Sequence, residues 1–577
     1  MRRGRLPVLL PLLLVVALLA LRGWQLSQRT FYWDDLVIPP SFRDSGLWAP
    51  YDGHLMPGSA ALQIAVDSLA PLQWWLPCVV TLAATALAVG LWRVLLGRLT
   101  DRWGLRVLGF TALVFSPFLG TATGWWSAGV NALAWQLTAA GVGLALTAPR
   151  GVVLRTTLAT LVLLGGLLMT ERALTVVPAV LAVALVLRVR RGPSRDRLVL
   201  VAPALLTLAW AGVYLALVGR GDGGGEAPGL HGVTSALGSS VLPGVLGGPW
   251  SWDRWDPSPA FSTTSTLVQV IVGVLLAVLL VWTLARTRRR PAAFLAALTA
   301  LAASCAYLLV VLLLLREGRT GDGASDLLAR GMHYYADWWS VTVVLVVAAP
   351  PVLARTWTAV LAAVLFTLSS TVSTVTWVSA WSDDATAAYL AGVRQAVSEA
   401  QDAGTVLLDQ NTPLEVLTPL MSPYNRVGAI AAGGGGDGVG DVSTAPTVVL
   451  PDGRVAEAHV LDVARRVQGD VPDCGVRVDA GQPQIITVEP ALPFGDWTWE
   501  FTATADRELT VELSTPNGLE DEAQWRARAV DVDVDTDLVT RWVNLSGGGG
   551  TILAEIDGPP GAHVCVGAGA VGALTAR

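Results

Sequence analysis

The sequence predicts a polytopic α-helical membrane domain of about 11 transmembrane helices, N-terminus in and C-terminus out. An extracytoplasmic domain follows, with an α/β part and a jelly-roll-like β-sandwich. Three observations lead to this fold class. The 577 residues are 53% hydrophobic and 15% charged, whereas soluble proteins carry about 25% charged residues. Long apolar segments fill most of the chain, and short alternating runs of strand-forming residues fill its last part. Charge is divided unevenly between the two parts.

The charge distribution indicates two bodies in different surroundings. Residues 1–379 contain 28 Arg and 16 acidic residues, a net charge of +12, and residues 380–577 contain 11 Arg and 29 acidic residues, a net charge of −18. The low charged fraction excludes an ordinary cytosolic enzyme and a disordered chain. The net charge of −6 argues against nucleic acid as a partner, because a nucleic-acid-binding protein normally presents a basic face.

The candidate spans are mostly apolar segments close to the roughly 20 residues that cross a bilayer. They cover residues 6–22, 76–97, 106–124, 130–148, 152–169, 172–187, 198–218, 266–285, 292–315, 338–354 and 357–378. Arg2, Arg3 and Arg5 place the N-terminus in the cytoplasm, because positive residues are enriched on that side. Alternation from there places most other Arg-rich connections inside as well.

The domain boundaries follow from this topology. The first apolar stretch has no clear A-x-A cleavage site, which favours a retained anchor over a cleaved signal peptide. The predicted domains are a membrane domain over 1–378, a small α/β connecting subdomain over 379–445 and a β-sandwich over 446–577. Loops 23–75, 219–265 and 316–337 lie on the outer side. The expected location is the plasma membrane, with the C-terminal domain outside the cytoplasm and membrane lipids as neighbours.

The outer domain offers two chemical features. Cys474 and Cys565 both fall in it, and an oxidising exterior favours a disulfide between them over two buried free thiols. Trp497 is a candidate contact for an acceptor glycan. The alternatives are a core position for this Trp and a structural or partner-binding role for the domain.

An acidic pair follows the first span. Asp34 and Asp35 stand in the segment QRTFYWDDLVIPPSF. Removing water from a carboxylate at a membrane surface costs free energy, unless the carboxylate is paired with a cation or takes part in binding or catalysis. This pair is therefore a candidate general base or metal ligand, with a solvated turn as the alternative. In the same loop His54 is a candidate hydrogen-bonding partner of a phosphate or an acceptor hydroxyl, with a structural cap as the alternative.

Two further outer turns carry candidate residues. Trp125 and Trp126 form a pair at a tight turn, where they are candidate glycan contacts that an interfacial aromatic belt explains equally well. Glu171 and Arg172 stand between two apolar runs. They are candidates for donor or acceptor binding, although the sequence by itself favours a structural role in which they pair with each other or snorkel.

The turn before the tenth predicted span carries a third group, Arg330, His333, Tyr334 and Tyr335. Arginine is a natural partner of a lipid-linked phosphate because its planar fork makes two hydrogen bonds to oxygen. These four residues are therefore candidates for donor-phosphate or acceptor binding.

These motifs and their topology resemble the GT-C superfamily of membrane glycosyltransferases, which includes protein O-mannosyltransferases, aminoarabinose transferases and mycobacterial arabinosyltransferases. FYWDD is similar to the acidic signature of the family's first loop, YDGHLMP resembles an H-x-x-P turn of some bacterial members, and TER resembles the K/S-E turn of others. The resemblance covers roughly residues 1–378. Basic residues that are all Arg indicate GC-rich coding and an actinobacterial-type member.

The resemblance implies a polyprenyl-phosphate-linked sugar donor and a cell-envelope glycan or protein acceptor. It implies that Asp34 or Asp35 deprotonates the acceptor hydroxyl, which attacks the anomeric carbon with inversion. Arg330, with His333 or Arg172, would then stabilise the leaving phosphate. No cofactor is expected. The requirement for a divalent metal stays open but is not favoured, because the sequence has no second acidic motif that clearly matches a metal-binding motif of the family.

Two other functions remain open from the sequence, a transporter or flippase for a lipid-linked glycan and a non-catalytic cell-envelope scaffold. Transporters commonly carry ionisable residues inside their spans and internal repeats. Here the spans are nearly free of charge and the polar groups gather on one side of the membrane. This distribution favours the interfacial enzyme.

Overall fold

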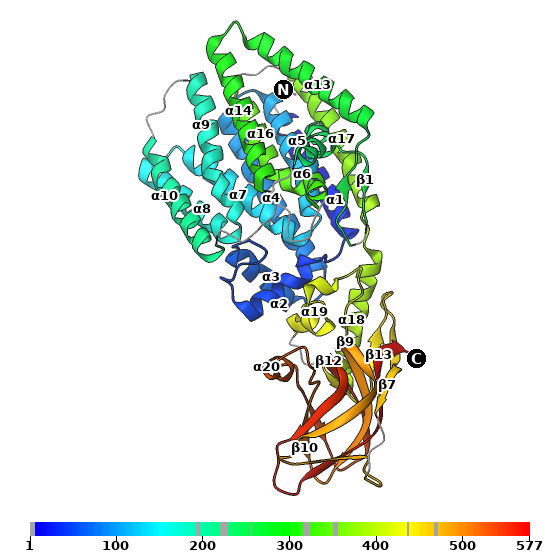
Figure 1. Ribbon diagram of the computed structural model, residues 1–577. Coiled ribbons are helices and arrows are strands. Elements are labelled where there is room, and N and C mark those ends of the chain that lie inside the picture. Colours follow the sequence, from blue (N-terminus) through cyan, green and yellow to red (C-terminus); the bar gives the residue numbers. More distant parts are fainter. Residues whose placement is uncertain are drawn as a thin grey trace. The chain divides into compact units, whose positions relative to one another are not determined.

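The computed structural model describes residues 6–191, 197–219, 229–255, 257–314, 324–349, 356–434, 438–466 and 471–577 (Figure 1). The chain divides into two compact units. Unit 1 comprises Met1–Asp67 and Gln73–Asp384, and unit 2 comprises Ser68–Leu72 and Ala385–Arg577. The segments predicted as a connecting subdomain and a β-sandwich fall almost entirely in unit 2.

Unit 1 is a helical, multi-pass membrane region. Within the described residues, 10 helical segments are long and apolar enough to cross a membrane. They are built from α1 (Leu6–Ser27), α4 (Trp75–Leu99), α5 (Trp103–Val114) with α6 (Pro117–Thr123), α7 (Trp126–Leu146), α8 (Val152–Met169), the 3-10 turn Glu171–Thr175 with α9 (Val176–Arg191), the 3-10 turn Arg197–Leu200 with α10 (Val201–Leu217), α13 (Thr266–Thr287), α14 (Pro291–Leu314) and α17 (Thr356–Ala380).

Shorter elements lie between the spans. They are α2 (Asp34–Ser45), α3 (Pro57–Leu69), α11 (Leu230–Ser235), the π-helical turn Ala236–Val241, α12 (Leu242–Val245), β1 (Trp252–Asp253), β2 (Phe261–Ser262), α15 (Ala324–Arg330), the 3-10 turn Met332–Tyr335 and α16 (Ala336–Ala348). The strands β1 and β2 pair in antiparallel fashion. Several of these short elements carry the candidate site described below.

The predicted span 338–354 is not among the 10 spans of the described residues. Helix α16 has 13 residues, which give a length of about 20 Å, whereas the hydrocarbon core is about 30 Å thick. Residues 350–355, where that span was expected to end, lie outside the described residues. Most of α16 is buried among other helices. The described part of α16 runs beside α9, with Asp337 2.8 Å from Arg172 at one end and the Ala348 carbonyl 2.9 Å from Arg190 at the other, so the span 338–354 stays a prediction.

Helix α1 and the turn that follows it are joined to the α6 region by three polar side chains. They donate to three carbonyls spaced four residues apart: Arg22 to Ser116 O (3.3 Å), Gln25 to Gly120 O (2.8 Å) and Arg29 to Gly124 O (3.1 Å). A Cβ on Gly120 would lie 2.6 Å from Nη1 of Arg22, so a side chain at position 120 would displace the Arg22 guanidinium. The contact fixes the end of α1 relative to the start of α7.

A buried charge cluster fixes the turn that follows α1. The Arg29 guanidinium lies 2.6 Å from an Asp383 carboxylate oxygen and 3.6 Å from the ring centroid of Trp381. Arg254 contacts the other oxygen of Asp383 at 3.2 Å. Buried ion pairs of this kind specify one arrangement, because removing one partner leaves an uncompensated charge. The chain therefore enters the segment Tyr32–Asp35 in a defined position.

Unit 2 contains α18 (Asp384–Ala403), a small parallel pair β3 (Leu407–Leu408) and β4 (Val439–Gly440), α19 (Val427–Ala431), α20 (Glu522–Arg526) and a large antiparallel sheet. The described strands of that sheet are β5 (Val442–Ser443), β6 (Thr447–Val449), β7 (Val455–Arg466), β8 (Val476–Asp479), β9 (Gln484–Ala505), β10 (Leu509–Ser514), β11 (Val530–Val534), β12 (Val539–Ile556) and β13 (His563–Ala576). They form one sheet whose main path is β11-β10-β12-β9-β13-β7-β6.

This single curled sheet differs from the predicted two-sheet sandwich (Figure 1). Runs that were expected to be separate strands are halves of long, bent strands: QIITVE and WTWEFTAT both belong to β9, and LVTRWVNLSG and TILAEID both belong to β12. The glycines at 547–550 coincide with register shifts in β12 and do not end it. Glycine inside a strand commonly marks such a bulge or bend, which the sequence pattern alone does not separate from a turn.

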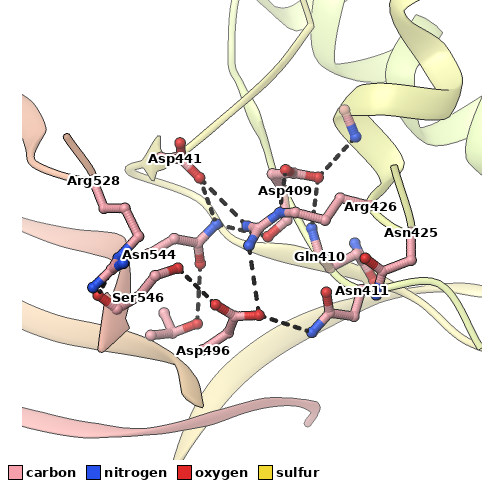
Figure 2. A network of polar contacts seen from close by, with 12 residues as sticks. Asp409, Gln410, Asn411, Asn425, Arg426, Asp441, Asp496, Arg528, Asn544 and Ser546 are labelled. Carbon is pink, nitrogen blue, oxygen red and sulfur yellow. Dashed lines mark hydrogen bonds and ion pairs between the residues drawn. The ribbon is translucent and has the colours of Figure 1, made fainter. Parts of the chain in front are cut away.

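A network of polar contacts connects the α/β segment of unit 2 to its sheet (Figure 2). Arg426 lies 2.7 Å from Asp409, 3.5 Å from Asp441 and 3.9 Å from Asp496, which is on β9. Asn544 on β12 donates to the Asp409 carbonyl at 2.7 Å and to the Asp441 carboxylate at 3.1 Å. Charge-assisted hydrogen bonds are stronger than neutral ones, so this network explains why residues 385–577 form one compact unit.

The structure joins Cys474 and Cys565 in a disulfide that closes a sequence separation of 91 residues. A crosslink of this length restricts the unfolded chain, and the chain-entropy relation gives a stabilisation of about 4.6 kcal/mol. Replacing both cysteines by serine is therefore expected to lower the free energy of unfolding of unit 2 by about that amount. Pulse proteolysis of the full-length protein in detergent, followed through fragments of unit 2, measures the change.

The matched control is the Cys78→Ser, Cys305→Ser variant, because both of these cysteines are free and lie in α4 and α14. Its proteolysis midpoint should stay close to that of the wild type. Equal midpoints for the wild type and the Cys474→Ser, Cys565→Ser variant would contradict a stabilising role of the disulfide.

Candidate active site

The candidate site is built by connections between the helices of unit 1. They are the segment after α1 with the start of α2, the loop before α3, the turn between α6 and α7, the turn after α8 and the turn before α16. Seven of the residues proposed from the sequence belong to this group through hydrogen bonds, ion pairs or ring contacts: Asp34, Asp35, His54, Trp125, Glu171, Arg172 and His333. The charge of Asp34 also acts on the phenol of Tyr334, which brings that residue to the group.

Asp35 is fully engaged by hydrogen bonds. Its Oδ1 accepts from the Ser127 amide at 2.8 Å and from the Ser127 hydroxyl at 2.6 Å, and its Oδ2 accepts from the Tyr32 amide at 2.9 Å. The residue is 3% exposed. Burial raises the pKa of Asp35 to about 7, although these hydrogen bonds oppose the shift. Asp35 therefore joins the start of α2 to the start of α7, and its oxygens are not open to a substrate.

Asp34 is in a different environment. Its Oδ1 accepts one hydrogen bond, from the Tyr51 hydroxyl at 2.9 Å, and the residue is only partly buried. Burial raises the pKa of Asp34 to about 6, against the effect of the Tyr51 hydrogen bond. At neutral pH the carboxylate is mostly ionised and its second oxygen is available. The two neighbouring acids therefore divide into one fixed group and one reactive group.

The backbone before Asp34 is strained. Trp33, which precedes α2, has a φ of 43°, a region that bulky residues rarely adopt. Such a conformation costs of order 1–3 kcal/mol and persists only where the surrounding structure enforces it. The buried contacts of Arg29 and Asp35 on either side supply that enforcement.

His54 and Glu171 form a pair across the site. Nδ1 of His54 lies 2.7 Å from a Glu171 carboxylate oxygen, and the His54 side chain is 46% exposed. The charge of Glu171 raises the pKa of His54 to about 9, so the imidazole is positively charged at neutral pH. Glu171 thus pairs with the first loop, not with Arg172 as the sequence favoured.

Arg172 faces the turn before α16. Its Nε lies 2.8 Å from Asp337 Oδ2, and its guanidinium also reaches the Tyr334 carbonyl at 3.4 Å. The Arg172 side chain is 25% exposed, whereas that of Asp337 is 4% exposed. Arg172 therefore presents a positive charge that is anchored on one side and accessible on the other.

His333 packs between the rings of Trp125 and Tyr334, with centroid distances of 5.5 Å and 4.0 Å. Burial lowers the pKa of His333 to about 3, so this imidazole is neutral under ordinary conditions. A neutral ring does not supply positive charge to a phosphate. The pairing of Arg330 with His333 that the resemblance implied therefore loses its electrostatic basis.

Three residues proposed from the sequence are placed elsewhere. Arg330 donates through Nε to the Ser235 hydroxyl at 2.9 Å, in the loop that precedes α13. Tyr335 is fully buried and donates to the Ala329 carbonyl at 2.7 Å. Trp497 belongs to β9 of unit 2, where its ring nitrogen donates to the Pro493 carbonyl. In the described part of the chain, none of the three forms a hydrogen bond or ion pair with Asp34 or Asp35.

An apolar cavity adjoins the polar group in unit 1. Its volume is about 370 Å³, within the range of ligand-binding pockets. Trp126, which follows Trp125, lines it together with Leu62 and Met169, and the remaining walls come from α4, α7 and α8. Leu62 precedes Gln63, and Trp126 precedes Ser127, so the cavity wall is continuous in sequence with the residues that surround Asp35.

Sequence reasoning missed Ser127 and Gln63. Ser127 holds Asp35, and Gln63 Oε1 lies 2.9 Å from the Ser127 hydroxyl. Neither residue type is distinctive, and they stand 64 positions apart. The position of Ser127 directly after the tryptophan pair at an outer turn is the one signal that marks it as a possible neighbour of the first loop.

Among the described residues, no group of three or more His, Cys, Asp or Glu side chains has an arrangement that could hold a metal ion. Asp34 and Asp35 also have different partners, and the oxygens of Asp35 are already occupied by hydrogen bonds. Among the cationic side chains, His54 interacts electrostatically with Asp34, and Arg29 with Asp35.

The sequence matches no protein-family model and no curated protein. Among solved structures the chain is similar to ArnT from Cupriavidus metallidurans bound to undecaprenyl phosphate, with 13% identity, a TM-score of 0.40 and coverage of 72% of this chain and 84% of that chain. It is also similar to the apo state of the same protein, with 14% identity, a TM-score of 0.42 and coverage of 72% and 83%. A likeness of this degree carries no argument about the chemistry of this chain.

Proposed function

We propose that this protein is an inverting membrane glycosyltransferase of the GT-C type, which uses a polyprenyl-phosphate-linked sugar and a cell-envelope glycan or protein acceptor. One observation carries the proposal. A half-buried carboxylate with a free oxygen, Asp34, lies in one group with the cationic side chains of His54 and Arg172, beside an apolar cavity of about 370 Å³. A base, positive charges for a phosphate and an apolar pocket for a lipid are the three parts that this reaction needs.

Asp34 is the proposed general base. It removes the proton from the acceptor hydroxyl as that oxygen forms a bond to the anomeric carbon from the face opposite the phosphate. The bond between the anomeric carbon and the phosphate oxygen breaks, and the bonding electrons leave with the polyprenyl phosphate. Asp35 holds Asp34 in place through Ser127 and Tyr32 and takes no proton from the substrate.

Arg172 and His54 are the proposed partners of the leaving phosphate. Arg172 is fixed by Asp337 and remains partly exposed, and His54 keeps its charge because Glu171 raises its pKa. Fixed positive groups stabilise the negative charge that develops on a leaving group without reorganising during the reaction. This assignment replaces the role that the resemblance implied for Arg330.

The apolar cavity is the proposed site for the first isoprenoid units of the donor. Its walls are almost entirely apolar, with Thr81 and Thr138 as polar exceptions. Its helices α4, α7 and α8 are membrane spans, so a lipid chain reaches it without leaving the bilayer. We also propose that unit 2 is extracytoplasmic, because its disulfide needs an oxidising compartment.

The proposal is tested with the purified full-length protein in nanodiscs. Each of a panel of radiolabelled polyprenyl-phosphate sugars is added with cell-envelope material from a strain that lacks the gene, and loss of label from the butanol-soluble lipid is followed. Consumption of one donor, with transfer of its label to the envelope fraction, supports the proposal. A protein that transfers no sugar but moves a labelled lipid-linked glycan between leaflets would be a transporter.

The pH dependence of transfer follows from the pKa shifts in the site. The base must be unprotonated, so kcat/KM should rise about tenfold per pH unit below pH 6 and level off above it. The proposed phosphate partner must be protonated, so kcat/KM should fall above about pH 9 as His54 loses its proton. Initial rates between pH 5 and pH 10 test both limbs. A His54→Gln variant should keep the acid limb and lose the alkaline one, and an acid limb centred near pH 4 would contradict the assignment of Asp34.

A further inference from the structure

Arg22 is a buried cation inside a membrane span that the proposed reaction does not use. It lies in α1, within the candidate span Leu10–Ser27, and is 2% exposed. Its guanidinium donates to Gln25 Oε1 at 2.6 Å and to the Ser116 carbonyl at 3.3 Å. No carboxylate among the described residues forms an ion pair with Arg22. A charged group in such a position needs further polar neighbours, because lipid and apolar side chains do not solvate it.

A small cavity lies against Arg22. Its volume is about 10 Å³, and its polar lining includes Arg22, Thr85 of α4 and Gln136 of α7. The Thr85 hydroxyl and the Gln136 side-chain nitrogen are both buried and have no hydrogen-bond partner in the described structure. The two residues are 3% and 1% exposed. Unsatisfied buried polar groups are rare in native proteins and commonly mark an ordered water or ion.

The orientation of the Gln136 amide is fixed by its oxygen. Gln136 Oε1 accepts from the Trp92 ring nitrogen and from the Ser340 hydroxyl, both at 3.0 Å. A flipped amide would set its NH2 group against the Trp92 donor, so the nitrogen is the atom left without a partner. The cavity therefore combines a guanidinium, an amide donor and a hydroxyl.

We propose that this cavity is a binding site for one water molecule inside the membrane region. A volume of about 10 Å³ is at the size of a single water, and buried waters typically make about three hydrogen bonds. The water oxygen accepts from the Gln136 amide and from the Arg22 guanidinium, and a water proton is donated to the Thr85 hydroxyl oxygen. The bound water joins α1, α4 and α7 and completes the solvation of the Arg22 charge.

The site acts on stability and does not depend on the proposed transferase reaction. Thr85→Val removes the hydroxyl at nearly constant volume. With a water present, this change breaks one of its hydrogen bonds, and the thermal midpoint of the full-length protein in nanodiscs should fall by about 1–3 °C. With an empty cavity, the same change removes an unsatisfied buried hydroxyl, and the midpoint should stay or rise. The two cases thus differ in sign.

Thr85→Ser is the matched control, because it keeps the hydroxyl. Its midpoint should stay above that of Thr85→Val. A high-resolution cryo-EM map of the wild type should contain an isolated density between Arg22, Thr85 and Gln136. A midpoint that does not fall in Thr85→Val, or a map without that density, overturns the proposal. A midpoint that rises with chloride but not with gluconate also overturns it, because the occupant is then an anion.

Discussion

Asp34→Asn will abolish sugar transfer, with kcat falling by about 10²–10⁴-fold, the usual contribution of a general base. The amide keeps the size of the carboxylate and can still accept from the Tyr51 hydroxyl, which lies 2.9 Å from Oδ1 in the wild type. It does not accept a proton from the acceptor. Donor binding should therefore change little, and the loss should appear in kcat. Single-turnover transfer of label from the polyprenyl-phosphate donor measures it.

Asp44→Asn is the matched control for this variant. Asp44 is an exposed acid on the same helix, α2, and has no place in the proposed machinery. Its transfer rate should equal that of the wild type. Asp35→Asn should fail differently, through reduced folded yield, because its NH2 group cannot accept from Ser127 or Tyr32. Wild-type kcat in Asp34→Asn would remove Asp34 from the reaction.

Arg172→Gln is expected to lower kcat by about 10²–10³-fold, the scale measured when one fixed donor to a developing anion is removed. Arg330→Gln should leave kcat nearly unchanged, because the Arg330 guanidinium contacts Ser235. The same donor-consumption assay compares the two variants. The contrast shows whether Arg172, as the structure suggests, or Arg330, as the resemblance implied, stabilises the leaving phosphate.

A second variant separates chemistry from folding. Arg172→Gln alone leaves the Asp337 carboxylate buried without its partner, which is expected to destabilise the protein by about 3–5 kcal/mol. The double variant Arg172→Gln, Asp337→Asn removes both charges and should recover most of the stability. If Arg172 binds the phosphate, kcat stays low in the stable double variant. Recovery of kcat together with stability would show that Arg172 has only a structural role.

The residues that gather in the candidate site were largely visible in the sequence. Asp34 and His54 stand in the loop between the first two predicted spans, and Arg172 stands at a turn between two later spans on the same predicted side of the membrane. Topology alone therefore placed them on the same side. It did not place Arg330, which contacts the loop before α13 although it is close in sequence to Tyr334.

The sequence did not show that the two acids have different environments and different proposed roles. Asp34 and Asp35 are adjacent and chemically identical, and their difference comes from Ser127, which is 92 residues away from Asp35 and hydrogen-bonds to Asp35 and not to Asp34. The position of Ser127 after the tryptophan pair does not say which of the two acids it contacts. The same limit applies to the β-sheet, because the glycines at 547–550 fit a turn between two strands as well as a bend within β12.

The sequence by itself determined the membrane character and most of the polar residues in the connections between spans, and it predicted which of these connections share a side of the membrane. Hydropathy and charge are local properties, and the bilayer imposes a length that can be counted along the chain. The tertiary structure alone decided how each of the two carboxylates is held, where Arg172 and Arg330 lie and whether strands join into one sheet. These outcomes depend on contacts between distant segments, and only packing brings those segments together.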